Sequence, residues 1–270
     1  MALLLPGAHW GYNKPPRGSQ IDRDSPFSRA LVWASILDDG SGVRASDISG
    51  YKNDASVSGS TTWGGSTIGG GAHITGGSTN LLKATSVPFT TSGPYSFMFH
   101  ALLDSGFNVN VAGLFAAGPA SSITSLQVLT NSSGPVLTLS IGIGASNTTG
   151  SGTTTIVAGT AYNIAVVYNA GVGTLYLNGR TEITVSATLS GAATGEIHIG
   201  NNATSAKNVA GVYSVAYAWQ RALSLGEVTT LVGEPYALIQ QPPLRRFFQM
   251  AYPLADAAQN LMLNTGTYAN

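Results

Sequence analysis

Alternation of apolar and polar side chains with a period of two runs through the middle of the chain and predicts β-strands. In the segment PYSFMFHALLD, Phe97 and Phe99 fall on one face while Met98 and His100 fall on the other. The runs VAGLFAAG, SLQVLTN and VLTLSIGIG follow, separated by Gly, Pro, Ser and Asn. Short strands spaced at roughly ten residues, with turn residues between them, predict a sandwich or a barrel.

The strongest turn signal is the pair Asn178-Gly179, because a type I′ hairpin turn requires positive φ at both central residues. It joins strands predicted over residues 174–177 and 180–185. Residues 164–168 form a nearly continuous apolar run, which is typical of a central strand. Residues 197–199 and 211–219 are the last predicted strands.

One helix is predicted, over residues 225–232. Ser224 and Glu227 have the spacing of a capping box, in which each side chain bonds the other residue's backbone amide. Gly233 and Pro235 then end the helix.

Both ends of the chain lack a helical or strand period. Residues 1–27 mix Pro, Gly and charged side chains and predict an extended N-terminal arm, followed by a domain over residues 28–240. Residues 241–270 predict a second extended arm. Arginine and aromatic side chains in the arms are predicted to anchor a partner protein, with packing onto the chain's own domain as the alternative. These candidates are Trp10, Tyr12, Arg245, Arg246, Phe247 and Phe248.

The order of elements after Tyr162 resembles the laminin G-like branch of the concanavalin A-like lectin and glucanase jelly rolls. That order is strand, Asn-Gly hairpin, strand, long loop, strand and a helix opened by RALS. The opening of the domain is also similar: a strand, a DISG loop and a Gly-rich stretch to Trp63. The resemblance implies an all-β fold of two antiparallel sheets packed face to face, with one short C-terminal helix. It also implies that Trp63 and Trp219 fill the sandwich.

The segment that follows the helix, with PYALI and LRRFF, is similar to bacteriophage structural proteins. The distribution of charged residues also favours a protein that is packed in a particle. Only 9% of the 270 residues are charged, the net charge is zero, and none lies between Asp104 and Arg180. A Gly- and Thr-rich β protein accounts for the uncharged stretch, and so does a surface packed in an assembly such as a homo-oligomer.

Composition also excludes several classes. The chain has no cysteine, so disulfides and thiolate metal sites are ruled out. The balanced charge gives no electrostatic basis for binding nucleic acid. No apolar run approaches the ~20 residues that span a membrane, and no secretory signal is recognised.

No motif in the sequence identifies an active site, and we predict that the protein is not an enzyme. Related glucanases carry E-x-D-x-x-E on one strand, and retaining hydrolysis needs two carboxylates about 5 Å apart. No two glutamates of this chain have that spacing. The four histidines are scattered, and no G-x-S-x-G turn supplies a nucleophilic serine.

Two binding sites are considered. Asp47 and Asp54 lie in an oxygen-rich loop and are candidate calcium ligands, although Ca²⁺ takes six to eight oxygens and turn chemistry explains the same residues. No other cofactor is expected. Tyr51, Asn201 and Asn202 lie in rim loops and are candidate glycan contacts.

These observations favour a structural protein of a bacteriophage virion, specifically a capsid decoration protein. It would lie on the exterior of the particle, with its arms on capsid proteins or other virion proteins. The alternative is a lectin-like module on the virion or tail that binds surface glycans for adhesion.

Overall fold

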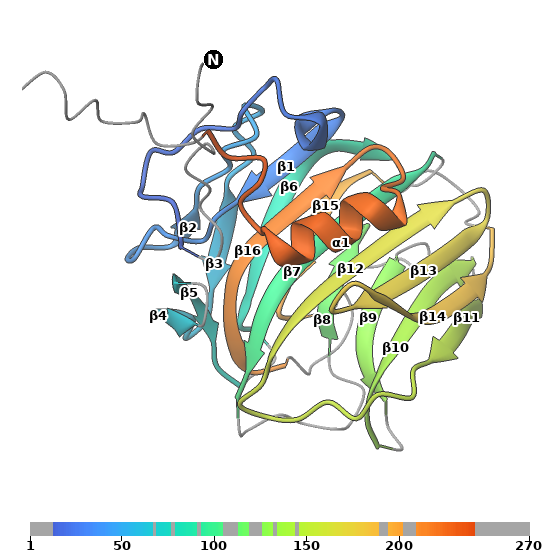
Figure 1. Cartoon of the computed structure of the whole chain (residues 1–270). Helices are drawn as coiled ribbons and strands as arrows, with labels where there is room; N and C mark the ends of the chain where they lie inside the picture. The colour runs from blue at the N-terminus through green and yellow to red at the C-terminus, as the bar shows by residue number, and fades with distance from the viewer. Residues whose placement is uncertain are drawn as a thin grey trace, which may run out of the picture. The chain divides into compact units, whose positions relative to one another are not determined.

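Two antiparallel sheets packed face to face form the fold, as the strand pattern predicts (Figure 1). The computed structural model describes residues 13–66, 69–76, 79–90, 93–104, 113–118, 126–131, 134–143, 146–188, 194–201 and 209–240. Residues 1–12 of the predicted N-terminal arm and the whole predicted C-terminal arm, residues 241–270, lie outside the described residues.

The first sheet is centred on two long buried strands, β7 and β16. β1 (Leu31–Ser35) pairs with β16 beside the main path of the sheet. That path runs β14 (Arg180–Ser186), β13 (Val172–Leu177), β12 (Ala161–Asn169), β7 (Tyr95–Leu103), β16 (Gly211–Trp219), β5 (Gly69–Ile74) and β4 (Thr62–Ser66).

Within the described residues the second sheet also has eight strands, and its middle strands come from distant parts of the chain. Its order is β11 (Ser146–Ser151), β10 (Gly134–Ile143), β9 (Leu126–Asn131), β8 (Gly113–Ala117), β15 (Thr194–Ile199), β6 (Leu81–Thr90), β3 (Ala55–Ser58) and β2 (Arg44–Ala45). Pairing between β15 and β6 brings the late part of the chain beside the early part.

The main core lies between the sheets and is rich in aromatic rings. Phe97 and Phe99 of β7 point into it and contact Phe115 of β8, with ring centroids 4.7 Å and 5.6 Å apart. Such pairs add to the stabilisation from buried area. The alternation predicted for this strand is therefore confirmed on its inward face.

The predicted hairpin and helix are confirmed as well. Asn178 and Gly179 have φ of 51° and 80°, as a type I′ turn requires. The helix α1 (Leu225–Gly233) begins with the complete capping box of Ser224 and Glu227. None of the helices in the described part of the chain has the length and apolarity required to cross a bilayer.

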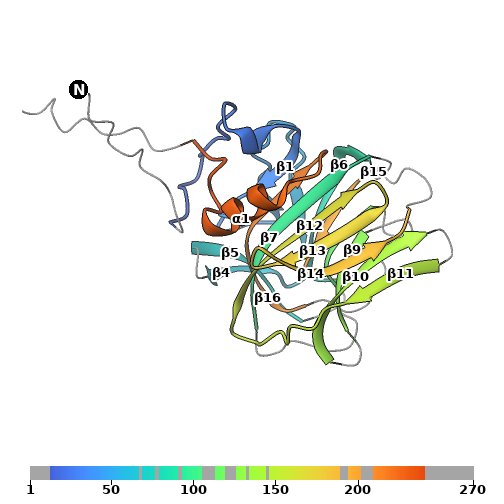
Figure 2. The same cartoon turned by 45° about the vertical axis from the view of Figure 1, so that its right-hand side comes forward.

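A second core covers the outer face of the first sheet. Met98, Tyr217 and Trp219 point outward from the sheet and are buried beneath Val228 and Leu231 of α1. Figure 2 shows α1 lying across this sheet. Trp219 thus fills a core, as the resemblance implies, but it is the outer one, whereas Trp63 is partly buried against the main core.

Residues 13–27, which the sequence assigns to the extended arm, pack on the domain. Ile21 is 2% exposed within the second core and forms an isolated bridge with Ile239. Asp22 donates its amide to Leu238 O, and Gln240 donates to Gln20 O, both at 2.9 Å. The buried Ile21 side chain and backbone hydrogen bonds to residues 238–240 hold this segment on the domain. Neither feature produces a periodic pattern in the sequence.

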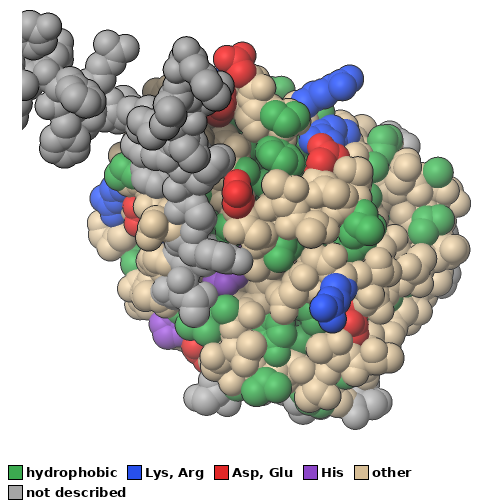
Figure 3. Space-filling view, in the orientation of Figure 1, with side chains coloured by type: hydrophobic (Ala, Val, Ile, Leu, Met, Phe, Trp, Pro, Cys, Tyr) green, Lys and Arg blue, Asp and Glu red, His purple; other side chains and the backbone are tan. Residues whose placement is uncertain are grey.

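Charged side chains are sparse on the surface of the domain. In Figure 3, viewed from the side of α1, they are few and scattered between apolar and uncharged polar side chains. The stretch between Asp104 and Arg180, which includes β8 to β13, contributes none.

Candidate functional site

The outer face of the second sheet differs from that of the first because a row of mostly polar residues crosses it. Strand register aligns these residues, and alternation turns them away from the core residues Leu82 and Ile197. We call them the polar row: Ser56, Lys83, His198, Ala116, Gln127, Ser140 and Thr149.

Exposure varies along the polar row. Gln127 and Ser140 in its middle are 7% and 2% exposed. Toward β6 the row opens, since the side chains of Lys83 and of the neighbouring Glu196 are 30% and 23% exposed. A ligand in solvent therefore meets this face first at Lys83 and Glu196.

Lys83, Glu196 and His198 form one hydrogen-bonded cluster. The Lys83 ammonium lies 3.1 Å from Oε1 of Glu196, and Nε2 of His198 lies 3.1 Å from its Oε2. Glu196 and His198 are two residues apart on β15 and share its outer face, while β6 places Lys83 opposite His198. The fold thus assembles the cluster from two paired strands.

The cluster fixes the protonation of Glu196 and His198. Burial acts to raise the pKa of Glu196, but hydrogen bonds from His198 and Lys83, and the Lys83 charge, bring it below its ordinary value. Burial lowers the pKa of His198, opposed by its hydrogen bond to Glu196 and helped by the Lys83 charge. At neutral pH Glu196 is therefore ionised and His198 is neutral.

The imidazole of His198 presents a buried acceptor. A neutral ring that bonds a carboxylate through Nε2 carries its proton there, which leaves Nδ1 with a free lone pair. Nδ1 is buried and has no hydrogen-bond partner in the part of the chain that the structure describes. The partly exposed carboxylate and ammonium form a compact donor and acceptor pair that suits a ligand rich in hydroxyl groups, and the buried imidazole supports the carboxylate from within.

The candidate calcium ligands, Asp47 and Asp54, accept hydrogen bonds within the loop between β2 and β3. Asp47 accepts hydrogen bonds from the backbone amides of Ala34, Ser49 and Asn53 at 3.2, 2.8 and 2.9 Å. Asp54 accepts from the amide of Asp47 at 2.8 Å and pairs with an exposed arginine of β2. Within the described residues, no three His, Cys, Asp or Glu side chains gather closely enough to hold a metal. Turn chemistry accounts for both aspartates.

The candidate glycan residues do not meet on one exposed surface. Tyr51 is 54% exposed in the loop before β3, as a rim contact requires. Asn201 follows β15 and is only 1% exposed, so its side chain does not face solvent. Asn202 lies outside the described residues, as do the predicted anchors Trp10, Tyr12, Arg245, Arg246, Phe247 and Phe248.

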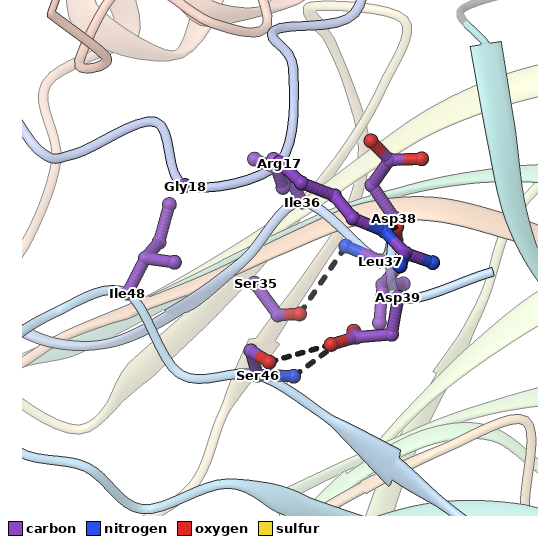
Figure 4. Close-up of a pocket in the computed structure, with 9 residues that line it drawn as sticks. All are labelled: Arg17, Gly18, Ser35, Ile36, Leu37, Asp38, Asp39, Ser46 and Ile48. Atoms are coloured by element: carbon purple, nitrogen blue, oxygen red, sulfur yellow. Dashed lines mark hydrogen bonds between the residues drawn. The ribbon is translucent and has the colours of Figure 1, made fainter. Parts of the chain in front are cut away.

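A small cavity opens at the end of β1, beneath the segment that contains Arg17 (Figure 4). Its volume is about 120 Å³, and Ile36 and Ile48 contribute apolar walls. Both carboxylate oxygens of Asp39 accept hydrogen bonds from Ser46, at 2.5 and 3.0 Å. Because its lining groups bond one another, the cavity is a weaker candidate than the cluster on the second sheet.

The glutamates considered for hydrolysis lie on separate elements with separate partners. Glu196 belongs to the cluster on β15, and Glu182 of β14 accepts hydrogen bonds from Thr153 and Thr154. Glu227 caps α1 and pairs with Arg221 at 2.7 Å. Each carboxylate thus has a local structural role.

The model of the concanavalin A-like lectin/glucanases superfamily matches residues 75–229, which is more than half of the chain. No curated protein matches the sequence. The match begins before β6 and ends within α1, so it includes all three members of the cluster.

Solved structures share the fold at low identity. Trypanosoma rangeli sialidase, in complex with 2,3-difluoro-KDN, superposes with a TM-score of 0.61 and 13% identity over 80% of this chain and 36% of its own. The binding domain of Paraclostridial Mosquitocidal Protein 1 gives 0.61 and 13%, over 77% of this chain and 53% of its own. This chain thus spans about a third to a half of those two proteins.

A third structure is matched over nearly its whole length. It is domain 4 of AbnA, an extracellular arabinanase from Geobacillus stearothermophilus, solved in complex with arabinotriose. The TM-score is 0.57 and the identity 15%, over 75% of this chain and 98% of that domain.

Proposed function

The chain belongs to the concanavalin A-like lectin/glucanase superfamily, and we propose that it is a lectin-like module that binds a glycan on the outer face of its second sheet. The glycan contacts Lys83 and Glu196, while the buried His198 orients the Glu196 carboxylate. The observation that carries this proposal is the contrast between the two sheets. The first sheet buries an apolar outer face under α1, whereas the second carries a polar row that is open to solvent at Lys83 and Glu196.

Sugar hydroxyls match the chemistry of this cluster. A hydroxyl both donates and accepts, so adjacent hydroxyls can donate to Glu196 and accept from Lys83 at the same time. Hydrogen bonds to charged groups are about twice as strong as neutral ones. The likeness to domain 4 of AbnA supports the proposal, since that whole domain is seen with arabinotriose.

Binding without hydrolysis agrees with the state of Glu196. A glycosidase needs one carboxyl group with a raised pKa as general acid and a second carboxylate nearby. Hydrogen bonds from His198 and Lys83 instead lower the pKa of Glu196. The carboxylate remains ionised and serves as an acceptor.

A glycan array tests the proposal, with the full chain compared with Lys83→Ala and Glu196→Ala. We expect wild type to bind a set of glycans and both variants to lose most of that binding. Lys52→Ala, at an exposed lysine in the loop before β3, is the matched control and should bind as wild type does. Unchanged binding by both cluster variants would reject this site, and no binding by wild type would reject the function.

A structural role in a bacteriophage virion is the second candidate. The uncharged stretch between Asp104 and Arg180 favours it, since β11 exposes Asn147, Thr149 and Ser151 to solvent without a charge. Such a surface suits packing against capsid proteins or further copies of the chain, on the exterior of a particle. A module displayed there would bind host glycans through its second sheet.

Cryo-electron microscopy of particles from the source tests the virion role. If the chain is a decoration protein, its density lies on the particle, and residues 1–12 or 241–270 contact capsid subunits. Chain lacking those residues should then decorate particles less. Particles without this density would remove the virion role and leave glycan binding to stand on the array alone.

A further inference from the structure

We propose that β11 is the contact strand of a homodimer, in which β11 of a second copy of this chain pairs with it antiparallel, edge to edge. The contact joins two second sheets into one continuous sheet. It requires no glycan, so it is independent of the proposed function.

β11 ends the second sheet with backbone groups that face away from its neighbour. Among the described residues it pairs only with β10 (Figure 1). The amide of Gly152, directly after β11, donates to Leu137 O at 2.9 Å and so points toward β10. Because backbone groups alternate in direction along a strand, those of Asn147, Thr149 and Ser151 point away from β10. β11 therefore presents the N–H and C=O groups of three residues to a further strand.

This edge lacks the features that usually prevent strand pairing. Natural proteins block open edges with charged side chains, proline or β-bulges. The sequence of β11, SNTTGS, contains no charged residue and no proline, and its register with β10 has no shift. Its inner side packs closely on the first sheet, since a Cβ on Gly150 would lie 2.7 Å from Val185 Cγ2. β11 is therefore a regular, uncharged edge that is already in place before a second strand arrives.

The other sheet edges in the described part of the chain are less suited to pairing. β14 carries two charged residues, Arg180 and Glu182, and β2 has only two residues, one of them charged. A loop covers β1, where Ile48 donates its amide to Ala34 O at 2.8 Å. β4 is the nearest rival because it is uncharged, but two of its five residues are glycines, which weaken a strand.

Twofold symmetry determines the register of the contact. A symmetric dimer uses the same surface on both copies, so β11 meets itself in the antiparallel direction. With Thr149 opposite Thr149 of the second copy, Asn147 lies opposite Ser151, and every outward backbone group of these three residues meets a partner. Threonine opposite threonine is also a favourable cross-strand pair. Any shift from this register leaves some of the outward groups unpaired.

The dimer has a consequence for binding that rests on the proposed function. Antiparallel neighbours in one sheet share their faces, so the outer faces of the two second sheets lie on the same side. Each face opens to solvent at Lys83 and Glu196. Two such sites directed to one side can bind a surface that carries many glycans, and linked sites raise the overall affinity.

Sedimentation velocity of the full chain over a concentration series, without glycan, tests the contact. We expect wild type to convert from monomer to dimer as the concentration rises. Thr149→Lys places two like charges opposite each other and should raise the dissociation constant of the dimer at least about tenfold. Thr149→Pro removes the central amide and should weaken the dimer as well, since an edge strand tolerates proline where the amide faces outward.

A matched variant and a second measurement keep the test decisive. Thr62→Lys makes the same change at an exposed threonine of the rival edge β4 and should leave the dimer intact. Hydrogen exchange of the Asn147, Thr149 and Ser151 amides should slow as the wild-type concentration rises, but not in Thr149→Lys. Thermal unfolding identifies a variant that fails to fold, and the remaining Thr149 variant then carries the comparison with the exchange data.

Three results would overturn the proposal. Wild type could remain monomeric up to its highest soluble concentration, or a dimer could survive both Thr149 variants. Loss of the dimer in Thr62→Lys alone would assign the contact to β4. Neither measurement involves a glycan, so failure of the dimer leaves the proposed function standing, and a glycan array without binding leaves the dimer standing.

Discussion

Asp47 shows how one side chain can organise a loop that resembles a calcium site in sequence. Its carboxylate accepts hydrogen bonds from three backbone amides, one in β1 and two in the loop before β3. It is 9% exposed, so these bonds replace water that the buried charge would otherwise need. Oxygen-rich composition in this loop therefore reflects its internal hydrogen bonds.

Replacing this carboxylate should destabilise the domain strongly. Asp47→Ala leaves three amides without an acceptor, and we expect the free energy of unfolding to fall by roughly 3 kcal/mol, since each unpaired buried group costs about 1–3 kcal/mol. Urea denaturation measures this. Asp24→Ala, an exposed aspartate, is the control and should be neutral. A calcium role would instead appear as a rise in the wild-type midpoint with added Ca²⁺, absent from Asp47→Ala.

His100 should make the domain less stable in acid. Burial, and secondarily the charge of Lys14, lowers its pKa from 6.5 to about 4 in the folded chain. The unfolded chain therefore binds the proton more readily, so this contribution to stability is complete above about pH 6.5 and declines as the pH falls toward about 4. The decline is roughly 3 kcal/mol at most.

The measurement is the free energy of unfolding between pH 4 and pH 8 for wild type and His100→Gln. The variant should show a shallower fall below about pH 6.5. His198 acts in the same direction, because burial lowers its pKa too, so part of the slope should remain. Parallel curves for the two proteins would mean that His100 titrates alike in the folded and unfolded chains.

Contact between β5 and β16 depends on a glycine. A Cβ on Gly71 would lie 2.4 Å from the carbonyl oxygen of Tyr213 and 2.8 Å from Val212 Cγ1. Gly71→Ala should therefore lower the free energy of unfolding by roughly 2 kcal/mol, as overpacking does. On neighbouring β4, a Cβ on Gly65 meets nothing within 4 Å, so Gly65→Ala is the matched control. Equal denaturation midpoints would show that β5 shifts without cost.

Local sequence patterns correctly predicted several strands, one hairpin turn and the helix. Alternation identified the inward face of β7, and turn and capping residues located the 178–179 hairpin and α1. The outward face of β7 was not predicted as a second core, because Met98 is buried by α1, which lies far along the chain. Period-two alternation describes one strand and says nothing about what covers it.

The candidate site was missed for a related reason. Lys83 and Glu196 are far apart in the sequence, and only the register of β6 and β15 brings them together. In the sequence His198 is one of four scattered histidines, and none of them marks a site. No local motif distinguishes a buried histidine that packs from one that holds a carboxylate. The lack of a partner for its Nδ1 among the described residues is visible only in three dimensions.

The N-terminal boundary of the domain lies before residue 28, because residues 13–27 pack on the sandwich. Residues 13–27 bury Ile21 and bond residues 238–240, so they should stabilise the sandwich although the sequence assigns them to an arm. Loss of one buried isoleucine side chain alone costs roughly 2–5 kcal/mol. We therefore expect chain 28–270 to unfold at a clearly lower urea concentration than chain 13–270.

The comparison between these two truncated chains isolates residues 13–27, because both lack residues 1–12. A matched point variant, Ile21→Ala in the full chain, should reproduce much of the loss. Gln20→Ala, at an exposed position whose backbone carbonyl bonds Gln240, is its control and should change little. If chains 28–270 and 13–270 unfold at the same urea concentration, the sandwich is complete without this segment. Residues 13–27 would then be free to bind a neighbour, as the sequence-based prediction of an arm requires.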